Sequence, residues 1–259
     1  MELPKAKGSS MTTGSAAGSG TARGGASGEL PRIVCHMVTS IDGRLHPSRF
    51  TASPDGVVKD WSRLTEGLHD SYGGEGWIVG RATMQEMAKG EPHPPAAFEP
   101  PPRPHHIARR DAKAIAVTFD RGGRVHYRAG EIGGDHAVAV LGSGVADAHL
   151  AELVADGVSY IVSQTPDIDL RAALAVLKRE FGVSQLLLEG GAEINGAFLA
   201  AGLVEELSVV VAPALDADLD VQGIVAFPGG LKGRVQLRLI GCDRLDHGAV
   251  HLRYEVLPG

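Results

Sequence analysis

The chain has 259 residues, 43% hydrophobic and 22% charged, an ordinary balance for a globular protein of one large domain or two small ones. Its net charge of -6 argues against a nucleic-acid surface or an anionic membrane as partner. With only two cysteines, Cys35 and Cys242, a disulfide framework or a cysteine zinc site is excluded, and a reducing cytoplasm is the natural setting. No apolar run approaches the roughly 20 residues that a membrane helix needs.

The first 29 residues differ in composition from the rest. Between Gly8 and Glu29, 19 of 22 positions are Gly, Ser, Thr or Ala, without the apolar segment of an export signal. Such a stretch cannot bury enough surface to offset its ordering entropy. We therefore expect a disordered tail over residues 1–29 and a folded domain over 30–259.

Short apolar runs then alternate with helical patterns. Residues 32–38 are nearly all apolar, as expected of a strand covered on both faces. We expect a loop over 50–58, a helix over 60–71, a strand over 76–80 and a helix from 81 to 87. Residues 91–104 hold seven of the fifteen prolines, which predicts a rigid surface loop. Histidines in or near it, His93, His105 and His106, are usually solvated, so we expect no metal site there.

The alternation continues and then changes character. Strands are predicted over 114–119, 137–141, 158–162 and 185–188, with helices over 146–155 and 168–181. Strands that alternate with helices indicate a mainly parallel sheet covered by helices. After Leu203 only strand-like runs remain, 206–211, 234–245 and 250–257, the last two joined by a hairpin turn at 246–249. The fold class is therefore α/β, with antiparallel strands finishing one side of the sheet.

Glycines follow the predicted strand at 185–188. Gly190 and Gly191 allow a sharp turn, and a helical pattern starts at Ala192. A strand that ends in glycines and begins a helix leaves free N–H groups and a positive dipole end at one spot, where phosphate binds well. Glu189 would lie beside that ligand. Taken alone, the glycine pair is equally well explained as a packing turn.

Two other motifs follow predicted strands. Residues 40–43 read Ser-Ile-Asp-Gly and residues 79–83 read Val-Gly-Arg-Ala-Thr. Each one alone is better explained as a turn. However, all three motifs fall at the carboxyl ends of predicted parallel strands, where open α/β sheets bind ligands.

A fourth glycine motif, residues 140–147, resembles a dinucleotide fingerprint. Asp147 occupies the third glycine position, and the acidic residue expected about 20 positions later is replaced by Ser163 and Gln164. We interpret this motif as a plain turn between strand and helix.

The order of these motifs, with Ala-Gly-Leu-Val-Glu-Glu-Leu at 201–207 and Ala-Pro at 212–213, resembles the reductase of riboflavin biosynthesis, the C-terminal domain of RibD. The resemblance spans roughly residues 32–257. It implies a dihydrofolate-reductase-like three-layer fold and NADPH-dependent reduction of a pyrimidinone that carries a ribosylamino 5-phosphate. The deaminase half is expected to be absent, because the chain has no H-x-E with P-C-x-x-C.

The resemblance also implies roles for individual residues. Glu189 would hydrogen-bond the substrate, and Ser40 would be presented beside it by a turn that Asp42 fixes; we take Glu189 and Ser40 as the catalytic candidates. Residues 191–197 would hold the cofactor pyrophosphate. The candidate cofactor residues are Thr39, Asp42, Trp61, Gly80, Thr83, Arg121, Ser163, Gly190, Gly191, Ala192, Glu193 and Ile194. Arg121 lies where the family often has a serine near the 2'-phosphate, so we expect NADPH rather than NADH.

The chain departs from the family at the substrate phosphate. Met87 occupies a family aspartate position, the proline-rich loop replaces a segment that carries an arginine, and a second arginine aligns near Ser71. Bidentate arginine contacts are the strong ones, so their loss weakens phosphate recognition. The candidates to replace them are Lys59, Arg63 and Arg103.

Three functions stay open at this point. The first is the riboflavin-pathway reductase, and the second is reduction of another pterin or nitrogen heterocycle such as dihydrofolate, which the missing arginines favour. The third is a nucleotide-binding protein without turnover. The resemblance further implies a homodimer, with a small-molecule pyrimidine or pterin as the other partner.

Overall fold

The computed structural model describes residues 28–65, 68 and 71–259. The predicted tail falls almost wholly outside these residues, as does part of the predicted helix at 60–71. The helices are α2 (Arg81–Ala88), α3 (Asp147–Ala155), α4 (Leu170–Phe181) and α5 (Ala192–Ala200), with short 3-10 turns η1 (Pro47–Arg49), η2 (Trp61–Thr65) and η3 (Asp246–Gly248). The strands are β1 (Arg32–Thr39), β2 (Gly76–Gly80), β3 (His105–His106), β4 (Ile115–Phe119), β5 (Glu131–Ile132), β6 (Asp135–Leu141), β7 (Ser159–Val162), β8 (Gln185–Leu188), β9 (Glu206–Val211), β10 (Val235–Arg244) and β11 (Val250–Pro258).

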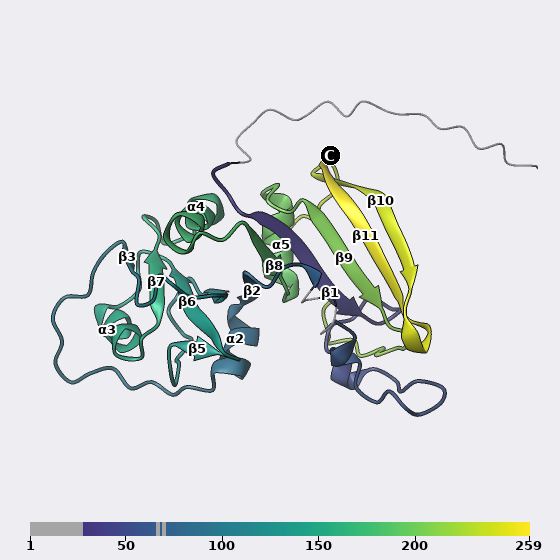
Figure 1. The fold of residues 1–259 in the computed structure, drawn as a ribbon, viewed down its shortest axis with the longest axis horizontal. Helices are drawn as coiled ribbons and strands as arrows, with labels where there is room; N and C mark the ends of the chain where they lie inside the picture. Colours follow the sequence, from purple (N-terminus) through teal and green to yellow (C-terminus); the bar gives the residue numbers. More distant parts are fainter. Residues whose placement is uncertain (1–27, 66–67, 69–70) are drawn as a thin grey trace, which may run out of the picture.

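All of these strands join one sheet, in the order β10-β11-β9-β1-β8-β2-β4-β6-β7-β3, with β5 paired to β6. Strands β9, β1, β8, β2, β4, β6 and β7 run parallel to their neighbours in that series, whereas β11 pairs antiparallel with both β9 and β10. Figure 1 shows β1 crossing between the helix-flanked half of the sheet and the antiparallel strands. The predicted mainly parallel sheet with antiparallel C-terminal strands is therefore confirmed.

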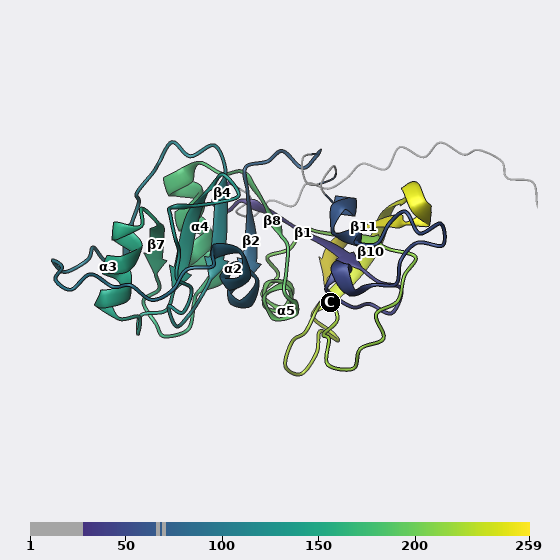
Figure 2. The same ribbon diagram turned by 90° about the horizontal axis from the view of Figure 1, so that it is seen from below.

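Helices cover both faces of the parallel part. One face packs Leu174 and Leu177 of α4 and Phe198 of α5 against alternate residues of β1, β4 and β8. The other face packs Met84 of α2 and Leu150 of α3 against β2, β4 and β6. Strand side chains are buried on both faces, as the nearly continuous apolar runs predict. The result is three layers, and Figure 2 shows α3 at the end of the molecule opposite β10 and β11.

The differences from prediction lie in the connections. The two-residue strands β3 and β5 were not predicted, because their pairing partners β7 and β6 lie far along the chain or across a glycine turn. Residues 61–65 form a 3-10 turn where the start of an α-helix was expected. The proline-rich segment 91–104 forms neither helix nor strand, as predicted. Within the described part of the chain, no helix has the length and apolar character to cross a membrane.

Buried His136 on β6 makes the stability of the fold depend on pH. It is 2% exposed, with Nδ1 3.0 Å from Gly130 O and Nε2 2.7 Å from Ser159 Oγ. Burial, followed by the charge of Arg109, lowers the pKa of His136 below its usual value. The unfolded chain therefore binds this proton more readily, so the stabilisation is present above about pH 6.5 and is lost as the pH falls.

We expect the free energy of unfolding to fall between pH 7.5 and pH 5.5 by at most about 1.4 kcal/mol, because pH 5.5 lies about one unit below the pKa of histidine in the unfolded chain. Urea unfolding at the two pH values measures this change. His136→Gln should show a smaller difference between them, and an undiminished pH dependence in this variant would contradict the assignment.

Candidate active site

The three motifs lie together at the carboxyl edge of the sheet. Strands β1, β8 and β2 are adjacent and parallel, so the turns that follow them emerge side by side. The turns after β2 and β8 are in direct contact, because Gly80 N donates to Gly190 O (2.8 Å) and Glu189 N donates to Ile78 O (2.9 Å). In Figure 1 the segment after β1 and helix α2 lie along the same lower edge. The sheet therefore brings together motifs that are up to about 150 positions apart in the sequence.

A pocket of about 670 Å³ opens between the turns after β2 and β8, and we call it the β2–β8 pocket. It contains seven of the predicted cofactor residues, Gly80, Thr83, Arg121, Gly191, Ala192, Glu193 and Ile194. The rest of its lining comes from the start of α2, the end of β4, the start of α4 with the residues before it, α5 and the segment after β9: Arg81, Ala82, Phe119, Asp167, Ile168, Leu170, Ala197 and Gln222. The pocket spans the carboxyl ends of β2, β4 and β8, which is where ligands bind in open α/β sheets.

Glycines are needed here for backbone geometry. Gly190 has a φ of +96°, and a Cβ atom added to it would lie 2.9 Å from Met37 Cε. The positive φ therefore disfavours any side chain at this position, whereas the flexible end of Met37 could move aside. An added Cβ at Gly191, in contrast, would meet no atom within 4 Å, because this residue faces open space at the pocket. Gly190 shapes the turn, and Gly191 leaves room for a ligand to approach the backbone.

Two helices begin at the β2–β8 pocket. The N-cap residues are Gly80 for α2 and Gly191 for α5, and neither has a side chain that can cap the first amides. Both helix N-termini therefore direct N–H groups and positive dipole ends at the same space, which favours a phosphate group. Arg121 lies at the rim, where its Nη1 donates to Asp167 Oδ1 (2.7 Å) with both side chains largely exposed. Such an exposed ion pair contributes little stability, so the guanidinium can exchange its partner for a ligand.

The turn after β1 is stabilised by hydrogen bonds among its own residues. Ser40 is buried, its Oγ accepts from Arg44 N (3.0 Å), and Thr39 Oγ1 donates to Arg44 O (3.1 Å). Hydrogen bonds, first from the Ser40 hydroxyl and then from backbone amides, lower the pKa of Asp42 to about 2. Asp42 thus fixes the turn as a carboxylate, and the Ser40 hydroxyl is used within the turn.

The long segment between β9 and β10 forms hydrogen bonds both with this turn and with α5. Asp42 Oδ2 accepts from Ala217 N (2.9 Å), and the side chain of Arg44 donates to Val221 O. Further along, Asn195 Nδ2 donates to Ile224 O (2.8 Å) and Ala226 N donates to Ala192 O (2.9 Å). One irregular segment therefore orders the β1 turn, the first turn of α5 and, through Gln222, one wall of the pocket.

Glu189 follows β8 directly and is half-buried. Burial, with the negative charge of Glu189 as a second cause, raises the pKa of the Cys35 thiol on β1 to about 12. The carboxylate of Glu189, just after β8, thus acts on the middle of β1, while Cys35 stays a protonated, unreactive thiol. Strand β8 lies between β1 and β2 in the sheet. Glu189, which follows β8, therefore lies between the turns that carry the other two motifs.

Some candidate residues do not line the β2–β8 pocket. Trp61 is fully buried with Val38 and Phe50, and its Nε1 donates to Thr51 O (2.9 Å). Ser163 lies at the end of β7, three strands from β2. Thr39, Asp42 and Gly190 shape neighbouring turns and are not part of the lining.

Other lining residues were missed by sequence reasoning. Phe119 ends β4, Asp167 precedes α4, and Gln222 lies in the segment after β9. The end of β4 carried a usable signal, since it is another carboxyl end in the same sheet. Gln222 had no signal, because its place depends on hydrogen bonds of an irregular segment. The fourth glycine motif stays outside the lining, and a Cβ at its Gly142 would lie 2.2 Å from Pro166 O, which accounts for that glycine by packing.

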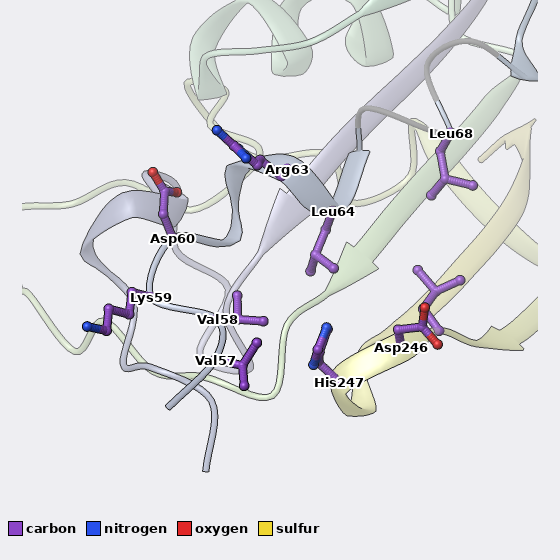
Figure 3. Close-up of a pocket in the computed structure, with 10 residues that line it drawn as sticks. Val57, Val58, Lys59, Asp60, Arg63, Leu64, Leu68, Asp246 and His247 are labelled. Carbon is purple, nitrogen blue, oxygen red and sulfur yellow. The ribbon is translucent and has the colours of Figure 1, made fainter. Parts of the chain in front are cut away.

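A second pocket, of about 650 Å³, lies beside η2 and the β10–β11 hairpin, and we call it the hairpin pocket. Figure 3 shows Leu64, Leu68 and Val58 in its interior, with Lys59 and Arg63 at its edge. Two of the three candidate phosphate cations therefore lie at one pocket. The third, Arg103, is held elsewhere, because it donates to Val145 O (2.9 Å) and Asp147 Oδ1 (2.7 Å) at the start of α3.

A mainly parallel sheet that finishes in antiparallel strands, with a ligand-sized pocket at its carboxyl edge, defines a three-layer α/β protein of the dihydrofolate-reductase-like class. The family model of the RibD C-terminal domain matches residues 31–250. The chain belongs to this family.

Solved structures with this fold include three with related descriptions. A pyrimidine reductase-like protein from Corynebacterium diphtheriae matches with a TM-score of 0.63 at 16% identity, over 90% of this chain and 94% of that one. Acinetobacter baumannii RibD matches with 0.60 at 18%, over 89% of this chain and 59% of that one. The riboflavin biosynthesis reductase Rib7 of Saccharomyces cerevisiae matches with 0.55 at 13%, over 88% and 90%. At these identities the likeness concerns the fold. A search of curated protein sequences gave no significant match.

Proposed function

We propose that the chain is an NADPH-dependent reductase of the riboflavin pathway, acting on a pyrimidinone that carries a ribosylamino phosphate. The β2–β8 pocket is the main support for this proposal, because two helix N-termini and Gly191, whose Cβ position is unobstructed, face the same space. Membership of the RibD C-terminal domain family supports the reductase class. The relatives described as a pyrimidine reductase-like protein and a riboflavin biosynthesis reductase support the substrate class.

The residues of the pocket fit a dinucleotide cofactor. The amides at the start of α2 and α5 suit the pyrophosphate, Thr83 adds a hydroxyl, and Arg121 suits a 2'-phosphate at the rim. Glu193 and Asp167 also line the space and oppose an anion, so the backbone amides and Arg121 must outweigh them. When bound, NADPH supplies the hydride, and the protein supplies orientation and electrostatics.

Within this scheme Glu189 orients the substrate. It directly follows β8, which lies between β1 and β2 in the sheet. The segment after β1 leads to the hairpin pocket, and the turn after β2 lines the β2–β8 pocket. A substrate placed between the two pockets would meet Glu189 at its ring, with Lys59 and Arg63 available to its phosphate. These cations replace the arginines that the family has and this chain lacks. The carboxylate would accept a substrate N–H and hold the ring at the cofactor.

Arg121 offers a test of cofactor choice. We expect Arg121→Ser to raise the KM for NADPH roughly tenfold while the KM for NADH changes little, because one charge-assisted contact to the 2'-phosphate is lost. Steady-state kinetics with both cofactors measure the effect. Arg238→Ser, which removes an exposed arginine from β10 at the far edge of the sheet, is the matched control. An equal rise for NADH would contradict a contact with the 2'-phosphate.

Turnover itself tests the proposal. NADPH oxidation, followed by its absorbance, should occur with the ribosylamino-pyrimidinone phosphate and not with dihydrofolate in a parallel reaction. Oxidation with dihydrofolate alone would move the chain to the pterin-reducing alternative. Cofactor binding without oxidation of either substrate would favour a nucleotide-binding protein without turnover.

A further inference from the structure

Five histidines and carboxylates gather around α3, and none of them lines either pocket described above. We call this group the α3 cluster; it consists of His93, His126, His149, Glu152 and Asp156. Three members come from α3 and the residue after it, at positions i, i+3 and i+7, which lie on one face of a helix. His93 comes from the proline-rich segment and His126 from the segment after β4, so the cluster joins three parts of the chain.

The side chains of the α3 cluster are within coordinating reach of one another. His126 Nδ1 lies 2.6 Å from Glu152 Oε1, His93 Nδ1 lies 3.3 Å from the same oxygen, and His93 Nε2 lies 2.9 Å from Asp156 Oδ1. Ligand atoms of His126, His149 and Glu152 all lie within 4.8 Å of one another. A tetrahedral zinc site with bonds of about 2.0 Å places its ligand atoms roughly 3.3 Å apart, so small side-chain adjustments close this triad around an ion.

Two atoms in the cluster are buried without a partner. His149 is 8% exposed, and its Nδ1 has no hydrogen-bond partner among the described residues. Asp156 Oδ2 is likewise buried and unpaired, although Oδ1 of the same carboxylate contacts His93. Buried polar atoms are nearly always satisfied, and a bound ion is one of the recognised reasons for an exception. The two orphaned atoms point to a ligand that the protein atoms do not supply.

The charges of the cluster call for a cation. Glu152 is 1% exposed, and its recorded ion-pair partners in the described chain are His126 and His93, without lysine or arginine. Glu152 and Asp156 thus place two carboxylates beside imidazoles, a donor set whose negative charge a divalent ion would offset.

We propose that His126, His149 and Glu152 bind a divalent transition-metal ion of the zinc class. Two imidazoles and one carboxylate suit zinc and its neighbours, whereas calcium and magnesium prefer oxygen ligands alone. His93 bridges Glu152 and Asp156 beside the ion and orients its carboxylate ligand. The ion would attach the segment after β4 to α3, and His93 would hold the proline-rich segment beside it. Figure 2 shows α3 at the end of the molecule farthest from the antiparallel strands. Its role is structural, since the site lies outside the candidate active site.

The test is a titration of the full-length protein with zinc chloride after treatment with a chelator and dialysis. We expect one zinc ion bound per chain by calorimetry, and a rise of several degrees in the melting temperature. Cobalt chloride should give the visible absorption of a four-coordinate Co²⁺ site. His126→Gln and His149→Gln should each lower the zinc affinity at least about 100-fold, because each removes one of three protein ligands.

His105→Gln, which removes an imidazole from β3 outside the cluster, is the control and should bind zinc as the wild type does. Circular dichroism of each chelator-treated variant shows whether it folds. Because His149 is the more buried ligand, the less buried His126 keeps the test informative if His149→Gln does not fold. Absence of zinc binding by the folded wild type would overturn the proposal, as would unchanged affinity in His126→Gln. In either case His126 and His93 would serve only as hydrogen-bonding partners of Glu152 and Asp156.

Discussion

Replacing Glu189 with glutamine is expected to lower kcat on the order of 100-fold, with little change in the KM for NADPH. Glu189 lies half-buried at the end of β8, outside the lining of the β2–β8 pocket, so its loss should spare the cofactor. Glutamine keeps the shape of the side chain and removes its charge, which weakens both the orientation of the substrate and any assistance to proton transfer. Groups in that role typically contribute 100-fold or more.

The matched control is Glu193→Gln, which removes a carboxylate four positions further on. Glu193 is exposed, lies in the first turn of α5 and lines the β2–β8 pocket. Its removal should leave kcat intact and lower the KM for NADPH slightly, because one negative charge near the pyrophosphate disappears. Steady-state kinetics of the two variants separate the roles. Unchanged turnover in Glu189→Gln would exclude Glu189 as the substrate-orienting group.

Gly196→Ala is expected to lower the free energy of unfolding, although alanine is normally the better residue in a helix. In an exposed helix, alanine is favoured over glycine by roughly 0.5–1 kcal/mol. At Gly196, however, an added Cβ would lie 2.0 Å from Ala226 O and 3.1 Å from Phe227 Cβ. The clash involves backbone that cannot rotate away, so we expect a net loss of about 1–3 kcal/mol in the free energy of unfolding.

The same substitution should weaken cofactor binding at a distance. Pushing Ala226 away strains the hydrogen bonds Ala226 N to Ala192 O and Asn195 Nδ2 to Ile224 O, and the segment they anchor carries Gln222 into the pocket wall. Urea unfolding and NADPH titration measure the two effects. Gly144→Ala, where an added Cβ meets nothing within 4 Å, is the control and should change neither quantity. A stabilised Gly196→Ala would show that α5 and this segment are not packed as described.

Much of the architecture was predictable because the signals are local. The apolar runs of β1 and β9 and the helical spacing of α4 follow from burial on one or both faces, which a short window reveals. The shared edge of the three motifs was also predictable. Parallel strands place their carboxyl ends together, so the residues after β1, β2 and β8 had to converge.

The remainder depends on contacts between distant segments. Trp61 reads as a helical apolar residue, and only the tertiary structure shows that its indole is buried with Phe50 and not at a pocket. Gln222 reaches the β2–β8 pocket because carbonyls and amides around it bind Arg44, Asn195 and Ala192. The α3 cluster escapes detection for the same reason, since His93 and His126 approach α3 from irregular segments. Side-chain periodicity carries no information about such segments.

A crystal structure of the protein with NADP⁺ would show whether the β2–β8 pocket binds the cofactor. The prediction is that the pyrophosphate lies against the amides of residues 191–194 and the start of α2, with the 2'-phosphate at Arg121. A nucleotide bound in the hairpin pocket, or no nucleotide at concentrations that saturate turnover, would contradict the claim.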